Sequence, residues 1–340
     1  MEFLRSQFEE ELNAEGDITI ANQAFLPSNI LQEMAPEAYD LTFNEWIQSR
    51  KTQLIEKADE ILEQFDNKLR FEQLALAYRG GAMIPFIGAG MSRASGFPLW
   101  TSFLFQLCEE SHVTTDTLEE LIEEGKYEEA AQELYNDLGE ALFNENIQVA
   151  FDRTRESVGP INYLSQLFQR SSVLTTNFDC LLERIYENDT NAGFDRVISG
   201  KSLNEVLRQI TGGSRLLIKL HGDCRQVAER VLLKAEYDAA YTDEKSVENF
   251  FSRVIFGNAL LFLGCSLSSD RTITTMKNIV SEIGSDALPR HYAFLGLRDG
   301  EDRIVRKKHL SEANIFPIWY EAGDDDEAIE ALFLKLMDDE

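Results

Sequence analysis

Residues able to bind or transform a ligand follow four of the short apolar runs in this chain. They are Gly88, Ala89, Gly90 and Ser92 after "MIPFI", Asn177 and Asp179 after "SVLTT", His221, Gly222 and Asp223 after "RLLIKL", and Ser266 and Asp270 after "ALLFLG". Glycines directly after a strand let backbone N–H groups approach an anion, and the N-terminus of a following helix favours negative charge. The amide, imidazole and carboxylate groups add hydrogen-bonding and acid–base capacity.

Each of these motifs also has a purely structural interpretation. The run from Gly88 lacks the last glycine of the G-x-G-x-x-G dinucleotide fingerprint, because Arg93 stands at that position, so it is equally compatible with a tight turn. His221 fits an ordinary polar residue at a strand end, and Asn177 and Asp179 fit helix N-caps. Because the carboxyl ends of parallel strands share one edge of a sheet, the convergence of all four motifs favours one ligand site.

The elements that position these residues are predicted from six continuously apolar runs. Continuous rather than alternating apolar character is typical of strands buried on both faces. Helical segments separate the runs, which predicts βαβ units. We therefore expect an α/β fold, with a Rossmann-like, mostly parallel sheet and helices on both faces. The runs are "MIPFIG", "SVLTTN", "RLLIKLHG", "ALLFLGCS", "HYAFLGL" and "IFPIWYE".

Three helical regions surround the predicted sheet. Residues 1–79 show no strand signal and form an N-terminal helical region, either a packing element or an arm that docks on a neighbouring subunit. One apolar stripe there consists of Leu54, Ala58, Ile61, Leu62 and Phe65. Residues 80–322 form the main domain, with a helical insertion at about 101–170 after the first strand. Residues 323–340 predict a final amphipathic, acidic helix.

Composition limits the partners and the compartment. The formal net charge is −28, so the chain repels nucleic-acid phosphates and anionic membrane surfaces. The four cysteines form no Cys-x-x-Cys pair, so their spacing indicates neither a zinc site nor a disulfide framework. The start lacks the layout of a signal peptide, and no apolar run reaches bilayer-spanning length. We expect a bacterial cytoplasmic protein.

Taken together and in order, the motifs resemble the NAD-binding signatures of the sirtuin superfamily. They are "FIGAGMSRASGFPLW", "LTTNFDCLLE", "IKLHGD" and "FLGCSLSSD", and "RVLLKAEYDAAYTDE" resembles a segment of the sirtuin-like branch found in bacterial antiphage systems. The resemblance covers about residues 80–300. Two features depart from the protein-deacylating sirtuins: the zinc-binding Cys-x-x-Cys pairs are absent, and the first loop continues Pro98-Leu99-Trp100 instead of Pro-Asp-Phe-Arg.

The resemblance to the zinc-free branch implies an NAD glycohydrolase that releases nicotinamide and ADP-ribose and depletes NAD during phage infection. It makes Asn177 the residue that orients the ribose hydroxyls or a water, and His221 the general base. The remaining NAD-binding residues that it implies are Gly88, Ala89, Gly90 and Ser92 at the diphosphate, Gly264, Ser266 and Asp270 at the adenosine half, Asp179 at the ribose or nicotinamide, and Pro98, Thr176 and Gly222. NAD is then the substrate, and no zinc is expected.

Two other functions stay open: a non-catalytic scaffold that binds NAD or ADP-ribose, and an NAD-dependent protein deacylase. An NADase needs restraint in its host, so we expect a homo-oligomer that uses the N-terminal helices, together with an activating partner. Among stand-alone relatives the usual partner is a HerA-type ATPase, with an Argonaute-type protein as the alternative.

Overall fold

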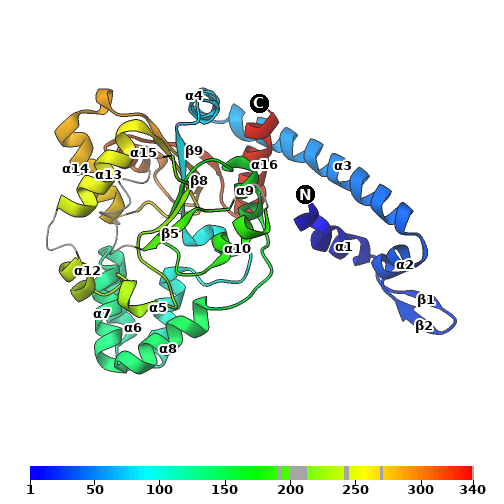
Figure 1. Cartoon of the computed structure of the whole chain (residues 1–340), viewed down its shortest axis with the longest axis horizontal. Helices are drawn as coiled ribbons and strands as arrows, with labels where there is room; N and C mark the ends of the chain where they lie inside the picture. Colours follow the sequence, from blue (N-terminus) through cyan, green and yellow to red (C-terminus); the bar gives the residue numbers. More distant parts are fainter. Residues whose placement is uncertain (190–192, 200–212, 241–244, 269–270, 339–340) are drawn as a thin grey trace.

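The computed structural model describes residues 1–189, 193–199, 213–240, 245–268 and 271–338 (Figure 1). A seven-stranded sheet with every neighbouring pair parallel forms its centre, in the order β5-β6-β4-β3-β7-β8-β9. The strands are β3 (Met83–Ile87), β4 (Val173–Thr175), β5 (Arg196–Ser199), β6 (Leu216–Lys219), β7 (Ala259–Leu263), β8 (His291–Leu297) and β9 (Ile315–Glu321). The six predicted strands are confirmed, and β5 is an additional edge strand.

The strand order contains one reversal. The chain starts the large sheet at β3 and places β4, β5 and β6 on one side of it, with β6 between β4 and β5. It then crosses to the other side of β3 and adds β7, β8 and β9. In open parallel sheets a ligand crevice lies outside the carboxyl ends of the strands at such a reversal. The loops after β3 and β7 meet there.

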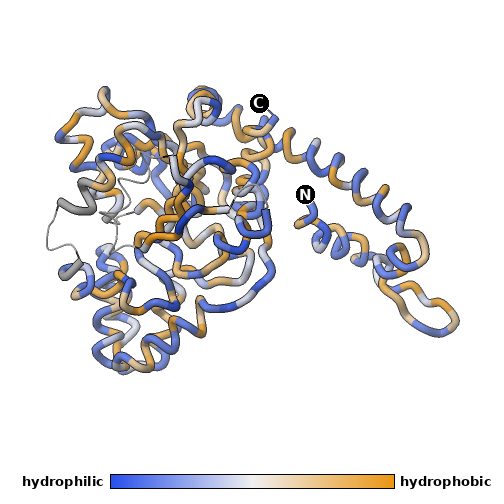
Figure 2. Tube along the Cα trace, in the orientation of Figure 1, coloured by the Kyte–Doolittle hydropathy of each residue, from blue (hydrophilic) through white to orange (hydrophobic). Residues whose placement is uncertain are grey.

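Helices cover both faces of the sheet, as predicted, and each face has its own apolar core (Figures 1 and 2). One face is covered by α13 (Lys245–Gly257), α14 (Arg271–Ile283) and α15 (Arg303–Ser311). The other is covered by α3 (Pro36–Glu63), α4 (Asn67–Arg79), α9 (Leu164–Leu167), α10 (Leu181–Asn188) and α16 (Asp325–Asp338). The orange strands at the centre of Figure 2 lie between these layers.

The predicted helical insertion follows the first strand of the large sheet. It contains α5 (Trp100–Glu109), α6 (Thr115–Glu123), α7 (Tyr127–Leu138), α8 (Glu140–Phe151) and the short 3-10 turn η3 (Pro160–Tyr163). Shorter elements elsewhere are η2 (Ala89–Ser92), η5 (Val227–Glu229), α12 (Lys234–Ala240) and η6 (Ser285–Ala287). The insertion carries aromatic side chains toward the loops after β4 and β6, as described below.

The N-terminal region is helical except for one hairpin, which the sequence interpretation missed. Its elements are η1 (Glu2–Leu4), α1 (Arg5–Asn13), β1 (Ile18–Ile20), β2 (Gln23–Phe25) and α2 (Pro27–Met34), followed by α3 and α4. Ala21 and Asn22 between the two strands both have positive φ, as in the tight turns that match strand twist. In Figure 1 this arm (η1 to α2) projects from the body beside α3.

Two further expectations need correction. Phe65 does not continue the apolar stripe of α3, because the helix ends at Glu63, and Phe65 is 50% exposed with positive φ. The last helix, α16, exists but is buried on nearly all sides rather than amphipathic, because it lies between the sheet and α3.

Ion pairs join α3 to the end of the chain. Arg50 pairs with Glu330 at 2.5 Å, and only 18% and 7% of these side chains are exposed. Tyr163 also donates to Glu330, at 2.6 Å. More exposed pairs flank them, namely Lys51–Asp338, Lys57–Glu327 and Lys335–Asp59. The helix that begins the body is thus fixed to the helix that ends it.

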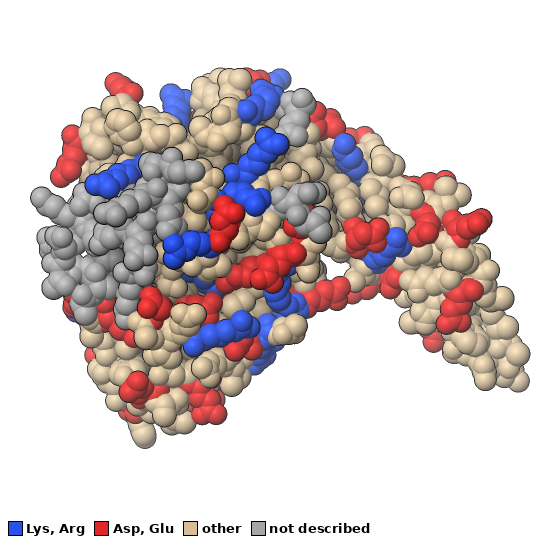
Figure 3. Space-filling view, in the orientation of Figure 1, with Lys and Arg blue, Asp and Glu red and all other residues tan. Residues whose placement is uncertain are grey.

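On the face that Figure 3 shows, the acidic side chains are not gathered in one patch. On the face in Figure 3 they are spread over the arm and the helical insertion, and lysines and arginines mix with them near the middle of the body. Within the described ranges, no helix combines the length and apolar character needed to cross a membrane.

Candidate functional site

The loops after β3 and β7 pack backbone against backbone. The Gly88 amide donates to the Leu263 carbonyl and the Gly90 amide to the Gly264 carbonyl, both at 2.9 Å. A Cβ on Gly88 would lie 2.5 Å from the Gly264 oxygen, and one on Gly90 would lie 2.8 Å from it. Gly264 itself has φ +65°, and a Cβ there would lie 2.4 Å from the Met91 nitrogen. Loop packing therefore accounts for these glycines, and their contact with a diphosphate stays a prediction.

Asn177 lies directly beyond β4 and is held rigidly. Its backbone amide donates to the Thr175 hydroxyl at 3.0 Å, and that hydroxyl donates to the Ile87 carbonyl at 2.9 Å. Its side-chain nitrogen donates to the Gly88 carbonyl at 3.2 Å and to the Ser92 hydroxyl at 3.1 Å. Both amide hydrogens are thus engaged, which fixes the orientation of the side chain and the direction of its oxygen.

The Asn177 oxygen Oδ1 is buried and has no hydrogen-bond partner among the described residues. A buried polar atom without a partner costs free energy, so such an atom in a folded protein calls for an explanation. A hydroxyl of a bound ribose, or a water, is a donor of the kind this oxygen needs. The chemistry of the site therefore fits a ribose-containing ligand.

Asp179 hydrogen-bonds Ser92, which in turn hydrogen-bonds the Asn177 side chain. The Asp179 carboxylate accepts the Leu181 amide at 3.0 Å, at the start of α10, and it also hydrogen-bonds Ser92. Burial raises the pKa of Asp179, although the Leu181 amide, Lys219 and Ser92 act in the opposite direction. With the carboxylate engaged in these contacts, Asp179 acts on the site through Ser92 and Asn177.

His221 and Asn177 lie on adjacent loops because the strands that precede them, β6 and β4, are paired in register. Thr175 pairs with Lys219, and Asn177 and His221 each follow their strand partner by two residues. The His221 ring is half-buried and lies 6.2 Å from the Phe178 ring and 5.8 Å from the Tyr237 ring. An imidazole and an amide oxygen thus stand on adjacent loops at the carboxyl edge of the sheet.

Aromatic rings from the helical insertion close one side of these loops. The Phe178 ring lies 5.5 Å from Trp100 of α5 and 5.8 Å from Phe151 of α8. Tyr237 comes from α12 and packs edge-on against His221. Phe178 and Phe151 belong to the buried core, so these contacts fix the loop of Asn177 against the insertion.

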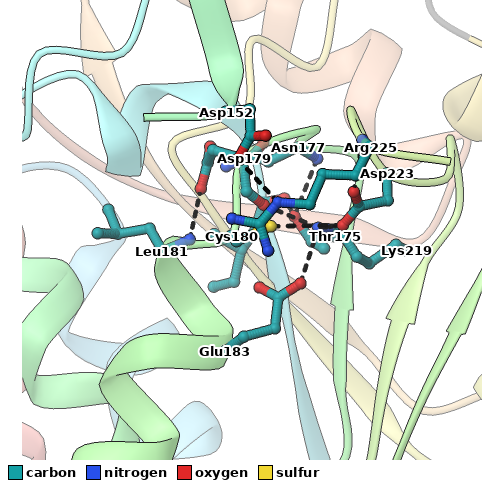
Figure 4. Close-up of polar contacts among 11 residues, drawn as sticks. Asp152, Thr175, Asn177, Asp179, Cys180, Leu181, Glu183, Lys219, Asp223 and Arg225 are labelled. Carbon is teal, nitrogen blue, oxygen red and sulfur yellow. Dashed lines mark hydrogen bonds and ion pairs between the residues drawn. The ribbon is translucent and has the colours of Figure 1, made fainter. Parts of the chain in front are cut away.

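Beneath the two loops lies a charged network around Lys219 (Figure 4). This lysine is fully buried, and its Nζ donates to the Asp179 carbonyl at 2.8 Å, to Glu183 at 2.8 Å and to Asp223 at 2.9 Å. Burial lowers the pKa of Lys219, but the nearby acids Glu183 and Asp223 more than offset this, so its pKa is raised. Lys219 thus joins the loop that bears Asn177 to the loop that bears His221.

The other predicted residues lie at the same edge with less specific contacts. Gly222 has φ +80°, and a Cβ there would lie 2.6 Å from the Glu229 carbonyl oxygen, which explains the glycine. Ala89 and Pro98 are half-buried, Thr176 donates its amide to the Ile87 carbonyl, and Ser266 is exposed. Asp270 lies outside the described residues.

The sequence interpretation missed Thr175, Lys219, Phe178 and Tyr237 as parts of the site. Thr175 and Phe178 stood inside the motif "LTTNFDCLLE", and Lys219 was the only charged residue in the buried run "LLIK". A lysine that interrupts an otherwise apolar buried strand was the available signal, because such a charge needs partners. Tyr237 likewise stood inside a quoted motif, "RVLLKAEYDAAYTDE".

A family model described as a SIR2-like domain matches residues 171–318, from the residues before β4 into β9. The match includes the loops that carry Asn177 and His221. Residues 171–318 are therefore similar to a SIR2-like domain. The first glycine loop precedes the matched range but packs directly against the matched loop at Gly264.

Curated relatives are distant and longer. The chain is 26% identical over 245 residues to "Defense-associated sirtuin 2" of Bacillus subtilis, covering 70% of this chain and 23% of that protein. It is 24% identical over 236 residues to "NAD(+) hydrolase ThsA" of Cytobacillus dafuensis, covering 69% and 45%. For the protein of the same name from Acinetobacter baumannii the identity is 23% over 203 residues, covering 60% and 40%. The chain therefore spans less than half the length of these relatives.

Proposed function

We propose that this chain hydrolyses NAD+ at the bond between nicotinamide and ribose and releases nicotinamide and ADP-ribose. The observation that carries the proposal is the buried, unpartnered Oδ1 of Asn177, on the loop adjacent to the one that bears His221. Two distant relatives named NAD(+) hydrolases support the choice of substrate.

In this mechanism the C1′–N bond breaks and its electron pair returns to the nicotinamide nitrogen. Positive charge develops on the ribose, as in other glycosyl cleavages. Asn177 Oδ1 accepts a hydrogen bond from a ribose hydroxyl or from the attacking water. If that group is the water, His221 takes its proton as the water oxygen bonds to C1′; if it is the ribose hydroxyl, His221 takes the hydroxyl proton and the resulting alkoxide takes the proton of the attacking water. His221 then releases its proton to solvent.

The neighbouring residues supply position and shelter. Ser92 and the Gly88 carbonyl hold the Asn177 amide, and Asp179 holds Ser92. The rings of Phe178 and Trp100, 5.5 Å apart, are proposed to shelter the nicotinamide end from bulk water. In this proposal the protein holds its groups in place before NAD+ binds, which lowers the entropic part of the barrier.

The test is release of nicotinamide and ADP-ribose from NAD+ by the purified chain. Removing a general base costs about 10²–10⁴-fold in rate, so His221→Ala should fall by that factor. Asn177→Ala should fall comparably. His112→Ala and Asn136→Ala are matched controls, since both residues are exposed on the helical insertion. A parent rate in His221→Ala contradicts the proposed base.

Calorimetry with NAD+ on the same samples separates a hydrolase from a binding scaffold. Binding by the parent and by all variants, with no release from any of them either alone or with the activating partner, replaces the hydrolase by an NAD-binding scaffold. A mass assay with an acylated peptide detects deacylation, the remaining alternative. No binding and no release from folded protein contradict the site itself.

We extend the proposal to a defence role in the bacterial cytoplasm, supported by the relative named a defense-associated sirtuin. Infected cells that carry the parent gene should lose NAD+ and restrict phage, and cells with Asn177→Ala should do neither.

To keep the NADase activity restrained in the host, we propose a homo-oligomer that forms through the N-terminal arm. The exposed side chains of Ile18, Ile20, Phe25 and Leu26 support this proposal. An activating partner such as a HerA-type ATPase, or alternatively an Argonaute-type protein, completes this proposal. A monomer by light scattering, with and without that partner, contradicts the oligomer.

A further inference from the structure

Two cysteines and an aspartate from different loops meet beside the Lys219 network. Cys180 precedes α10, and Asp223 and Cys224 lie in the loop after β6. Their ligand atoms all lie within 4.8 Å of one another. We propose that Cys180, Asp223 and Cys224 bind a thiolate-preferring divalent ion of the zinc class. Sequence spacing alone does not predict this site, because 43 residues separate Cys180 from Asp223.

The distances suit a tetrahedral ion. Zinc lies about 2.3 Å from a thiolate sulfur and about 2.1 Å from a carboxylate oxygen, so two such ligands stand about 3.6 Å apart. The Cys180 sulfur lies 3.4 Å from Asp223 Oδ2. The Cys224 amide donates to the Phe178 carbonyl at 3.3 Å, which holds the two loops together at this point. The ligand atoms lie within 4.8 Å of one another, so they need to approach by at most about 1.2 Å to reach the separation of about 3.6 Å at one ion.

The charges balance. Without an ion, the network holds Lys219, Glu183 and Asp223 and has a formal charge of −1 when both thiols are neutral. Binding forms two metal–sulfur bonds, and the two thiol protons leave to solvent. The two new thiolates cancel the charge of a divalent ion, so the network keeps its charge of −1. No additional net charge is buried, which removes the usual electrostatic cost of a buried cation.

A second, independent feature points to a ligand here. Glu183 Oε2 is buried and has no partner among the described residues, while Oε1 of the same carboxylate receives Lys219 at 2.8 Å. Three protein ligands leave the fourth tetrahedral position to water. A buried acceptor in the same network can take a hydrogen bond from that water. Metal sites commonly orient their ligands through such outer contacts.

The chemistry of the donors selects the metal class, and their exposure supplies an entry path. Two sulfur ligands favour zinc-class ions over magnesium or calcium, which prefer all-oxygen sites. Cys224 is fully buried, but Cys180 and Asp223 are partly exposed, so an ion reaches the site from solvent. Once bound, it joins the loop of Asn177 and Asp179 to the loop of His221.

The test uses Co²⁺ as the probe, on the full chain, reduced and freed of metal. The parent should bind one ion per chain and develop thiolate-to-cobalt charge-transfer absorption with the intense visible bands of tetrahedral cobalt. Added Zn²⁺ should bleach both. The surface carboxylates of this acidic chain can bind Co²⁺, but they give no thiolate band. Cys180→Ser and Cys224→Ser should lose the band, and Cys108→Ser, remote in α5, should keep it.

A second measurement guards against variants that fold poorly. Zn²⁺ should raise the Tm of the parent and of Cys108→Ser, and should leave the Tm of Cys180→Ser unchanged. The proposal is overturned if the folded, reduced parent shows no thiolate band, or if Cys180→Ser and Cys224→Ser keep the band at parent strength. Loss of two hydrogens on air oxidation, with no cobalt band in the reduced protein, also overturns it and identifies a disulfide pair instead.

Discussion

Replacing Gly88 by alanine tests whether the absence of a side chain is needed for packing against Gly264 or only for binding a ligand. The new Cβ would lie 2.5 Å from the Gly264 oxygen, and ordinary contact begins at 3.4 Å, so the loops must separate by about 0.9 Å. Overpacking of this kind costs about 1–3 kcal/mol. The hydrogen bond from Gly90 to the same oxygen, worth about 1 kcal/mol, is strained as well. We expect Gly88→Ala to lose about 2–4 kcal/mol of stability without any ligand.

The assay is thermal and urea unfolding of the ligand-free protein. For 340 residues, about 2.1 cal/mol/K per residue gives an unfolding entropy of about 0.7 kcal/mol/K, so the Tm should fall by about 3–6 °C. Gly257→Ala is the matched control, because a Cβ there would have no atom within 4 Å. If Gly88→Ala unfolds like the parent and loses only NAD+ binding, the packing argument is refuted and the glycine serves the ligand.

Three further predictions concern the ion pairs between α3 and α16, the pH dependence of stability and the residue that positions Asn177. Arg50→Ala leaves its glutamate partner on α16 buried without a cation, and should cost about 3 kcal/mol in urea unfolding, whereas Lys51→Ala, from an exposed pair, should cost under about 1 kcal/mol. Burial lowers the pKa of His291 to about 3. Below about pH 6.5 the unfolded chain therefore binds a proton at this imidazole that the folded chain does not, and the free energy of unfolding should fall by up to about 1.4 kcal/mol per pH unit toward pH 3. His291→Asn, which cannot titrate, should reduce that pH dependence. Thr175→Val removes the hydroxyl that holds Asn177 and leaves the buried Asn177 amide without that partner, so it should cost about 1–3 kcal/mol in urea unfolding and lower kcat at least tenfold, and an unchanged kcat would contradict this positioning role.

Much of the sheet could be predicted because its strands are buried on both faces. β3, β4, β6 and β7 are buried at every position, so they read as continuous apolar runs. β5 was missed because only Ile198 is buried in it, and an edge strand leaves little pattern in the sequence. The β1–β2 hairpin is exposed at all six positions and left even less.

The candidate site was predictable as a set of motifs but not as an arrangement. The sequence by itself determined which residues follow buried strands, because burial imposes an apolar pattern on each strand separately. It could not determine that Gly88 packs on Gly264, or that Cys180 meets Cys224. Those contacts depend on which strands become neighbours, and strand order is a property of the whole sheet. Only the tertiary structure therefore decided that the buried Lys219 joins the loops after β4 and β6.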